Sequence, residues 1–148
     1  MTVRVQKEDF DVGMELDSVS AQFKGIGGVC CFVGVVRDFK ENSKISSMTL
    51  EHYPGMTEKQ LKLIQEEAHQ RWPLETSLII HRYGKLSPGE NIVLVITASG
   101  HRKAAFESCE FLIDWLKTKA PFWKKEHTPT GDEWVQAKIA DDLAAQDW

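Results

Sequence analysis

The sequence predicts an α+β fold in which a mainly antiparallel sheet packs against two main helices. Strand-like runs of β-branched and aromatic residues alternate with two segments of helical apolar spacing, and the connections between them are short. The expected order is strand, helix, strand, strand, helix, strand, strand, helix, strand, which is typical of an α+β sandwich. The 148 residues contain no repeat and no linker-like stretch, so a single domain over residues 1–148 is expected.

The first half of the chain contains three strand-like segments. "TVRVQ" (2–6) alternates as a short strand does, and the run over 27–37 is rich in β-branched residues. A polar stretch, 38–47, separates this run from "MTLEHY" (48–53). These last two segments are expected to form a hairpin with a mobile tip.

A helix is predicted directly after the Pro54-Gly55 turn. Thr57 and Gln60 have the spacing of a capping box, and Pro73 marks the end of the pattern. The apolar positions recur at helical intervals: Leu61, Ile64, Ala68 and Trp72.

The second half predicts two more strands and a second helix. The strands cover 76–84 and 91–99, with a Pro88-Gly89 turn between them. The helix is expected from about Arg102 to Lys119, with one apolar stripe. It ends there because Pro121 disfavours helical geometry in the residue before it.

Composition excludes several classes of function. The net charge is −4 and the pI about 5.7, whereas nucleic-acid-binding domains normally carry a basic excess. No apolar run approaches the roughly 20 residues that span a bilayer, and the N-terminus lacks the pattern of a secretory signal. We therefore expect a cytoplasmic protein that binds neither nucleic acid nor membrane.

Neither the cysteines nor the histidines indicate a metal site. Cys30, Cys31 and Cys109 are an odd number without CxxC spacing, which is typical of reduced thiols in the cytoplasm. His52 and His81 lie within apolar strands and are expected to be hydrogen-bonded and partly buried. They do not combine with the cysteines into zinc-ligand spacing, so no metal and no cofactor are predicted.

Positive charge is concentrated in "LKTKAPFWKKEH", residues 116–127. Four lysines stand against one glutamate there, a local charge of +3, so that the remainder of the chain carries −7. An acidic body with one basic pocket indicates a small anionic ligand or an acidic peptide terminus.

Two lysines of this segment are candidates for chemistry. Lys117 follows the core residue Leu116 by about 100° around the helix, so it flanks the apolar face, where a lysine can be partly desolvated and act as a base or nucleophile. Lys124 can converge on the same anion from beyond Pro121. The alternative is that lysines at a helix end only offset the helix dipole and the others are solvated.

Two further segments are candidate anion-binding groups. His101 and Arg102 follow a strand end at a helix start, where free N–H groups and the helix dipole favour anions. Arg37 ends the long strand before a polar loop, where a guanidinium can bind a phosphate or carboxylate. A plain helix cap and a surface arginine remain the alternatives.

Five stretches, in order and with near-identical spacing, resemble the catalytic large subunit of molybdopterin synthase. They are "LEHYPGMTEK", "RWPL", "HRYGKLSPGE", "SGHRKAAFE" and "LKTKAPFWKKE…TPTGDEWV", and the similarity runs from about residue 28 to 148. The resemblance implies an α/β hammerhead fold. It also implies transfer of sulfur to cyclic pyranopterin monophosphate, forming the dithiolene of molybdopterin.

The resemblance further implies partners. The sulfur donor would be the thiocarboxylated C-terminal glycine of a small ubiquitin-like subunit, whose tail inserts into the large subunit's pocket. Two large subunits would form a homodimer, with one small subunit at each end of a heterotetramer.

The same resemblance assigns roles to individual positions. The catalytic lysines of the family fall on Lys117 and Lys124. The substrate-binding positions, besides these two lysines, are Val35, Val36, Arg37, His101, Arg102, Lys125 and Glu126. In the family, the His-Arg pair is thought to reach the pocket from the neighbouring large subunit. Lys125 and Lys138 stand where arginine is expected in relatives, which keeps the charge but loses the bidentate fork.

Two other functions fit part of the pattern. A non-catalytic adaptor that captures the C-terminal tail of a ubiquitin-like protein would use the same lysines, but would not need the second anion site at Arg37 and His101-Arg102. A phosphate-ester hydrolase fits less well, because the sequence contains no metal set and no clear nucleophile-base pair.

Overall fold

The computed structural model describes residues 1–37, 39–40, 43–44, 47–129, 131–135 and 139–148. Its elements are β1 (Thr2–Gln6), α1 (Val12–Gln22), β2 (Gly28–Val35), β3 (Phe39–Lys40), β4 (Ser43–Lys44), β5 (Ser47–His52), α2 (Met56–Arg71), β6 (Leu74–Arg82), β7 (Gly84–Leu86), β8 (Asn91–Ser99), α3 (Arg102–Thr118), β9 (Phe122–Thr128), β10 (Gly131–Val135) and α4 (Ile139–Gln146). The predicted α+β class is confirmed, and the two main helices are α2 and α3.

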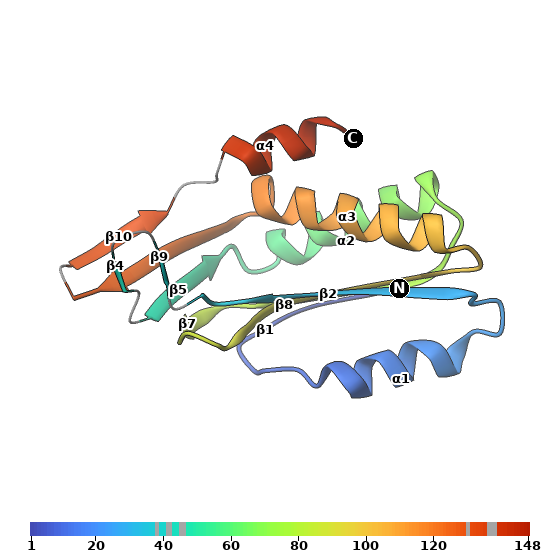
Figure 1. Cartoon of the computed structure of the whole chain (residues 1–148), viewed down its shortest axis with the longest axis horizontal. Coiled ribbons are helices and arrows are strands. Elements are labelled where there is room, and N and C mark those ends of the chain that lie inside the picture. Colours follow the sequence, from blue (N-terminus) through green and yellow to red (C-terminus); the bar gives the residue numbers. More distant parts are fainter. Residues whose placement is uncertain (38, 41–42, 45–46, 130, 136–138) are drawn as a thin grey trace.

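A central sheet of four strands, in the order β1-β6-β8-β2, forms the middle layer. Only β1 and β6 run parallel; the other pairs are antiparallel. Helices α2 and α3 cover one face of this sheet and α1 covers the other (Figure 1). Because both faces are covered, β6 is buried throughout 76–82 and β8 throughout 93–99, as continuous apolar strands in doubly covered sheets are.

Alternation along the strands divides the core between the two faces. Ile79 and Val95 pack with Leu61 of α2 and Leu112 of α3. Their neighbours in sequence point to the α1 side, where the buried cluster contains Phe10, Val19, Leu78, Ile80, Leu94, Ile96 and Ala98. The period of two in strand side chains is therefore what places one helical layer on each face.

A second sheet, in the order β10-β9-β5-β7, extends beyond one end of the central sheet (Figure 1). It has a small buried cluster of its own, made of Val36, Met48, Leu50 and Leu86. The two sheets meet where β6 ends and β9 begins. There the His81 ring stacks on the Phe122 ring, with centroids 3.7 Å apart and planes 16° apart.

The hairpin predicted from 27–37 and 48–53 is wrong. β2 pairs with β8 in the central sheet, whereas β5 pairs with β7 and β9 in the second sheet. β2 thereby pairs over its whole length with the buried strand β8, and β5 lies between two other strands of the second sheet. The polar connection itself carries the short pair β3–β4, and the predicted mobile tip falls partly on residues 38, 41–42 and 45–46, outside the described residues.

The predicted capping box of α2 is also wrong. The N-cap is Gly55, whose backbone N–H donates to Glu58 Oε2 at 2.6 Å. Gly55 has a φ of 84°, a conformation that glycine adopts at little cost. Thr57 lies within the helix and donates its hydroxyl to the Tyr53 carbonyl at 2.8 Å. The turn residue, and not the threonine, therefore begins the helix.

Replacing Leu61 by alanine should destabilise the fold by about 2–5 kcal/mol, because its side chain is fully buried between α2 and the central sheet. Leu63→Ala is the matched control: it makes the same chemical change two residues along α2, at a side chain that is 49% exposed. Urea unfolding should place the control within about 0.5 kcal/mol of the parent chain. Equal losses for both variants would contradict the packing described here.

The stability of the chain should depend on the charge of His81. Burial lowers the pKa of His81 from 6.5 to about 4, while its hydrogen bond to the Arg82 carbonyl raises it in part. Between these values the unfolded chain binds more protons than the folded chain, so stability is fully present above pH 6.5 and falls as the pH drops towards 4. The loss through this window amounts to about 3 kcal/mol.

His81→Gln removes this titration and isolates it. The difference in unfolding free energy between the parent chain and His81→Gln should shrink by about 3 kcal/mol from pH 7.5 to pH 4, as followed by urea unfolding at several pH values. The pKa of His69 is also lowered by burial, but it contributes equally to both proteins. A difference that stays constant with pH would show that His81 is not held neutral.

Candidate functional site

Lys117 lies in the last turn of α3 with an exposed side chain. The helix is fixed on the central sheet by its buried stripe, which includes Cys109 and Leu112. Leu116, one residue before Lys117, packs partly buried against the same cluster. The flanking position expected from the sequence is therefore present, while the ammonium itself reaches solvent in the single chain.

Lys124 approaches the same region from β9. Leu50 is its direct partner across β5, and Met48 is the partner of Glu126, so Lys124 and Glu126 share the face of the second sheet that holds its buried cluster. Glu126 is only 7% exposed. Phe122, two residues before Lys124, also belongs to this face, which we call the inner face.

Lys125 points to the opposite, outer face, because successive residues of a strand alternate. Its Nζ lies 5.4 Å from the centre of the Trp134 ring and 3.9 Å from Asp132 Oδ2. A hydrogen bond from His127 lowers the pKa of the Asp132 carboxyl, and the Lys125 charge lowers it further. The segment predicted to bind substrate, Lys124–Glu126, thus presents its two lysines to different sides of the sheet.

Two histidines lie beside the lysines on the inner side. His81 stacks on Phe122. Burial is the main cause of the lowered pKa of His81, and the charges of Lys117, His52 and Lys124 lower this pKa a little more. The His52 ring is tilted against Phe122 at 5.9 Å and against Tyr83 at 4.4 Å. Lys117, Lys124, His52 and His81 therefore form one group, which we call the lysine–histidine site.

Of the three residues in the predicted binding segment 35–37, one is buried and two are exposed. Val36 is a core residue, 4% exposed, whose N–H donates to the Glu90 carbonyl at 2.9 Å. Val35 and Arg37 on either side are exposed. Val35 pairs with Asn91, close to Val93, the partner of His81, so this segment ends at the same edge of the central sheet as the lysine–histidine site.

His101 and Arg102 lie at the other end of α3. His101 is its N-cap residue, and both side chains are exposed. The 17 residues of α3 span about 25 Å at about 1.5 Å per residue. Arg102 also lies near Gly28, at the opposite end of β2 from Val35. Within one chain, the His-Arg pair is thus far from Lys117 and Lys124.

His52 and His81 are the site residues that the sequence interpretation missed. Both are hydrogen-bonded and partly or fully buried, as expected, but their proximity to the lysines was not foreseen. They come from strands of different sheets, and only the junction of these sheets brings them together. The period of two could have placed His52 on the apolar face of its strand, but not beside Lys124.

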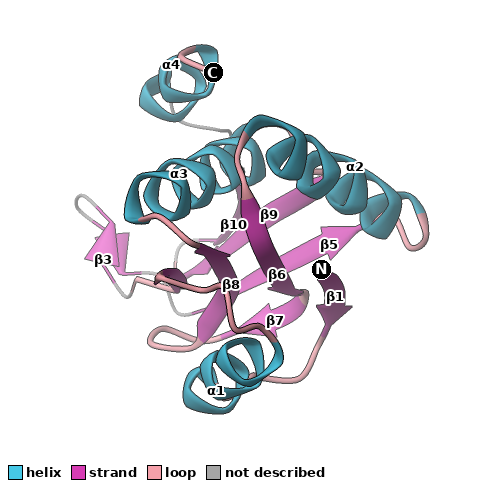
Figure 2. Ribbon diagram, turned by 90° about the vertical axis from the view of Figure 1, so that its right-hand side faces the viewer, coloured by secondary structure: helices cyan, strands magenta, loops and turns pink. Residues whose placement is uncertain are grey.

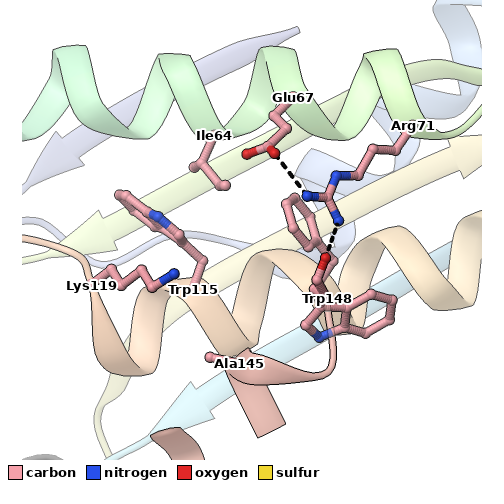
Figure 3. Close-up of a pocket in the computed structure, with 8 residues that line it drawn as sticks. Ile64, Glu67, Arg71, Trp115, Lys119, Ala145 and Trp148 are labelled. Atoms are coloured by element: carbon pink, nitrogen blue, oxygen red, sulfur yellow. Dashed lines mark hydrogen bonds and ion pairs between the residues drawn. The ribbon is translucent and has the colours of Figure 1, made fainter.

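A small pocket of about 230 Å³ lies elsewhere, between α2, α3 and α4 (Figure 3). Arg71 closes one side through hydrogen bonds to Glu67 and to the Trp148 carbonyl, both 2.8 Å. Lys119 extends along this pocket beside Trp115 (Figure 3). Lys119 is therefore separated from Lys117, although both come from the same end of α3.

Among the described residues, no group of three or more His, Cys, Asp or Glu side chains is arranged to hold a metal ion. In the same part of the chain, no helix is long and apolar enough to span a membrane.

Comparison with known proteins identifies the family. The model of the "MoaE protein" family matches residues 5–119. A molybdopterin synthase catalytic subunit from Pseudomonas aeruginosa is 55% identical over 148 residues, which cover 100% of this chain and 99% of that protein.

Solved structures agree with this match. A molybdopterin biosynthesis MoaE protein from Burkholderia ambifaria superposes with a TM-score of 0.85 at 50% identity, covering 99% of this chain and 97% of that chain. The complex of subunits 1 and 2 of molybdopterin-converting factor from Helicobacter pylori shares the fold, with a TM-score of 0.73 at 23% identity over 93% and 90% of the two chains. The chain belongs to the MoaE family, the family of molybdopterin synthase catalytic subunits.

Proposed function

We propose that the chain transfers sulfur from the thiocarboxylated C-terminus of a small ubiquitin-like subunit to cyclic pyranopterin monophosphate, forming the dithiolene of molybdopterin. The observation that carries this proposal is the convergence of Lys117 and Lys124 on one site from two different elements. Its membership of a family of catalytic subunits supports the reaction class. The free thiols of Cys30, Cys31 and Cys109 fit the reducing cytoplasm, where we place the reaction.

The charge of the site suits this chemistry. The substrate carries a cyclic phosphate and the donor a thiocarboxylate, so the pocket must hold two anions close together. Lys117 and Lys124 offset their repulsion, and they stabilise the charge that develops as sulfur attacks and oxygen leaves. We assign Lys117 as the principal acid/base or charge-stabilising group and Lys124 as its partner.

The remaining predicted residues are proposed to bind and to support. Arg37 follows Val35 and Val36 at the adjoining strand end and is free to bind the substrate phosphate. Glu126 shares the inner face with Lys124. Lys125, on the outer face, is proposed to hold β10 against β9 through Asp132 and Trp134 rather than to contact the substrate. Lys138, the other position where relatives are expected to have arginine, lies outside the described residues.

A second copy of the chain is proposed to supply His101 and Arg102. β2 is the last strand of the central sheet, and Val29, Phe32 and Val35 on it are 38%, 37% and 45% exposed. An unpaired apolar edge of this kind is a template for another strand. On the adjoining helix, Phe106 is 62% exposed.

The geometry of such a dimer follows from symmetry. Two β2 strands related by a two-fold axis would pair antiparallel, so the Gly28 end of one chain would lie beside the Val35 end of the other. Arg102 lies at the Gly28 end and Lys117 at the Val35 end of the same helix flank. The pairing would bring Arg102 of one copy towards Lys117 of its neighbour and complete two sites.

The third component is the small subunit. In the Helicobacter pylori neighbour, subunits 1 and 2 of molybdopterin-converting factor form a complex. We propose that this chain likewise binds a small ubiquitin-like protein, whose C-terminal tail reaches the lysine–histidine site, and that two such pairs form a heterotetramer.

Lys117→Ala should lower the single-turnover rate of dithiolene formation by about 100-fold or more, because it removes the group that handles the proton or charge. The assay mixes the chain with cyclic pyranopterin monophosphate and the thiocarboxylated small subunit. Lys103→Ala, at an 86% exposed lysine of the same helix, is the matched control and should stay within about two-fold. Folding and small-subunit binding should persist in both variants. Turnover of Lys117→Ala within a few fold of the parent would refute the assignment.

Mixing two inactive variants tests the shared site. Lys117→Ala and Arg102→Ala chains, refolded together, form heterodimers in which one of the two sites has both native residues. About one quarter of the parental activity should therefore return if subunits mix at random. Each variant alone should remain inactive. Absence of recovery, with heterodimers verified by mass spectrometry, would place both residues in one chain's site.

A further inference from the structure

His81 occupies the centre of the lysine–histidine site, and the proposed sulfur transfer gives it no role of its own. Its ring is 7% exposed and is held between β6 and the start of β9 by the stack on Phe122. His81 pairs with Val93 on the face of the central sheet that α3 covers. Besides burial, the charges of Lys117 of α3, His52 of β5 and Lys124 of β9 lower the pKa of His81. The buried imidazole thus lies beside two lysines that come from different elements, α3 and β9.

Hydrogen bonding fixes the tautomer of His81. The Arg82 carbonyl lies 2.8 Å from Nδ1 and can only accept, so Nδ1 carries the proton. The other nitrogen, Nε2, then keeps its lone pair and is an acceptor. His52 is arranged in the same way: the Thr57 hydroxyl donates to the Tyr53 carbonyl, which leaves its oxygen to accept from His52 Nδ1 at 3.2 Å.

Burial keeps His81 in this neutral form at physiological pH, with its pKa lowered to about 4. A neutral imidazole beside two lysines adds no repulsion to the site, whereas an imidazolium would push the ammonium groups away. The only hydrogen-bond role left to Nε2 is to accept, and an ammonium is a donor without acceptor capacity.

Building on the proposed sulfur transfer, we propose that His81 is a positioning residue for Lys117: its Nε2 accepts a hydrogen bond from the Lys117 ammonium and holds Nζ towards the reacting anions. The side chain of Lys117 is exposed at the end of α3. A hydrogen bond to the fixed Nε2 of His81 would reduce the number of orientations that the Lys117 side chain samples. Correct orientation of a catalytic group contributes strongly to the rate.

Three substitutions of His81 distinguish its role as a hydrogen-bond acceptor from its role in stacking on Phe122. Glutamine places a polar atom near the position of Nε2, asparagine near that of Nδ1, and phenylalanine keeps only the aromatic stack on Phe122. The single-turnover rate at saturating substrate should stay within about ten-fold for His81→Gln and fall about 100-fold for His81→Asn and His81→Phe. Thermal unfolding and small-subunit affinity, measured alongside, report on folding.

A second measurement does not depend on turnover or on substitution of His81. In an NMR titration of the parent chain, the pKa of His81 should be well below 6.5, and Lys117→Met should raise it because one facing charge is lost. Lys62→Met, at an exposed lysine of α2, should leave it unchanged. The NMR titration tests the contact between Lys117 and His81 even if the chain does not catalyse the proposed sulfur transfer. In that case the parent chain itself would show no turnover.

Either of two results overturns the proposal. A parental rate in His81→Phe, or equal rates in His81→Gln and His81→Asn, would show that the ring only packs. A pKa of His81 that ignores Lys117→Met would show that the lysine does not face the imidazole, and this result decides the matter if the His81 variants do not fold.

Discussion

The contact between the end of β6 and the start of β9 is the constraint on which the site depends. Without the stack of His81 on Phe122, the second sheet would be joined to the central layer mainly through connections and its own small core. Figure 1 shows β9 starting near the end of α3 and running away from the two long helices, while α1 covers the far side of the central sheet (Figure 2). This contact sets where β9 begins, and hence where Lys124 lies relative to the end of α3.

Electrostatics explains why a neutral polar ring, that of His81, lies at this junction. A group of lysines that must hold two anions repels itself when the site is empty, and a further buried cation would add to that cost. His81, whose pKa is lowered by burial, provides a hydrogen-bond acceptor without charge. The excess of positive charge is thus confined to side chains that reach solvent and can meet the anions, while the body of the chain stays acidic.

Local patterns predicted much of the fold, and pairing between distant strands was where prediction failed. Apolar spacing defined α2 and α3, and alternation defined the strands, because these periods are properties of the backbone. The hairpin prediction was wrong because the local sequence of 27–37 and of 48–53 does not indicate which sheet each strand joins. For the site, the position of Lys117 followed from helical phase. The opposite faces of Lys124 and Lys125 could have been predicted once 122–128 was recognised as a strand. The proximity of His52 and His81 to the lysines could not have been predicted, because the two histidines lie on strands of different sheets.

The most direct test of the account is the affinity of the chain alone for cyclic pyranopterin monophosphate, measured by calorimetry for the parent and for two variants of adjacent lysines. Lys124→Met should raise Kd about ten-fold or more, corresponding to about 1.4 kcal/mol, while Lys125→Met should change it little. This result would place the anion on the inner face, beside His81 and Lys117. An equal or larger loss for Lys125→Met would place the anion on the outer face of the second sheet and contradict the account.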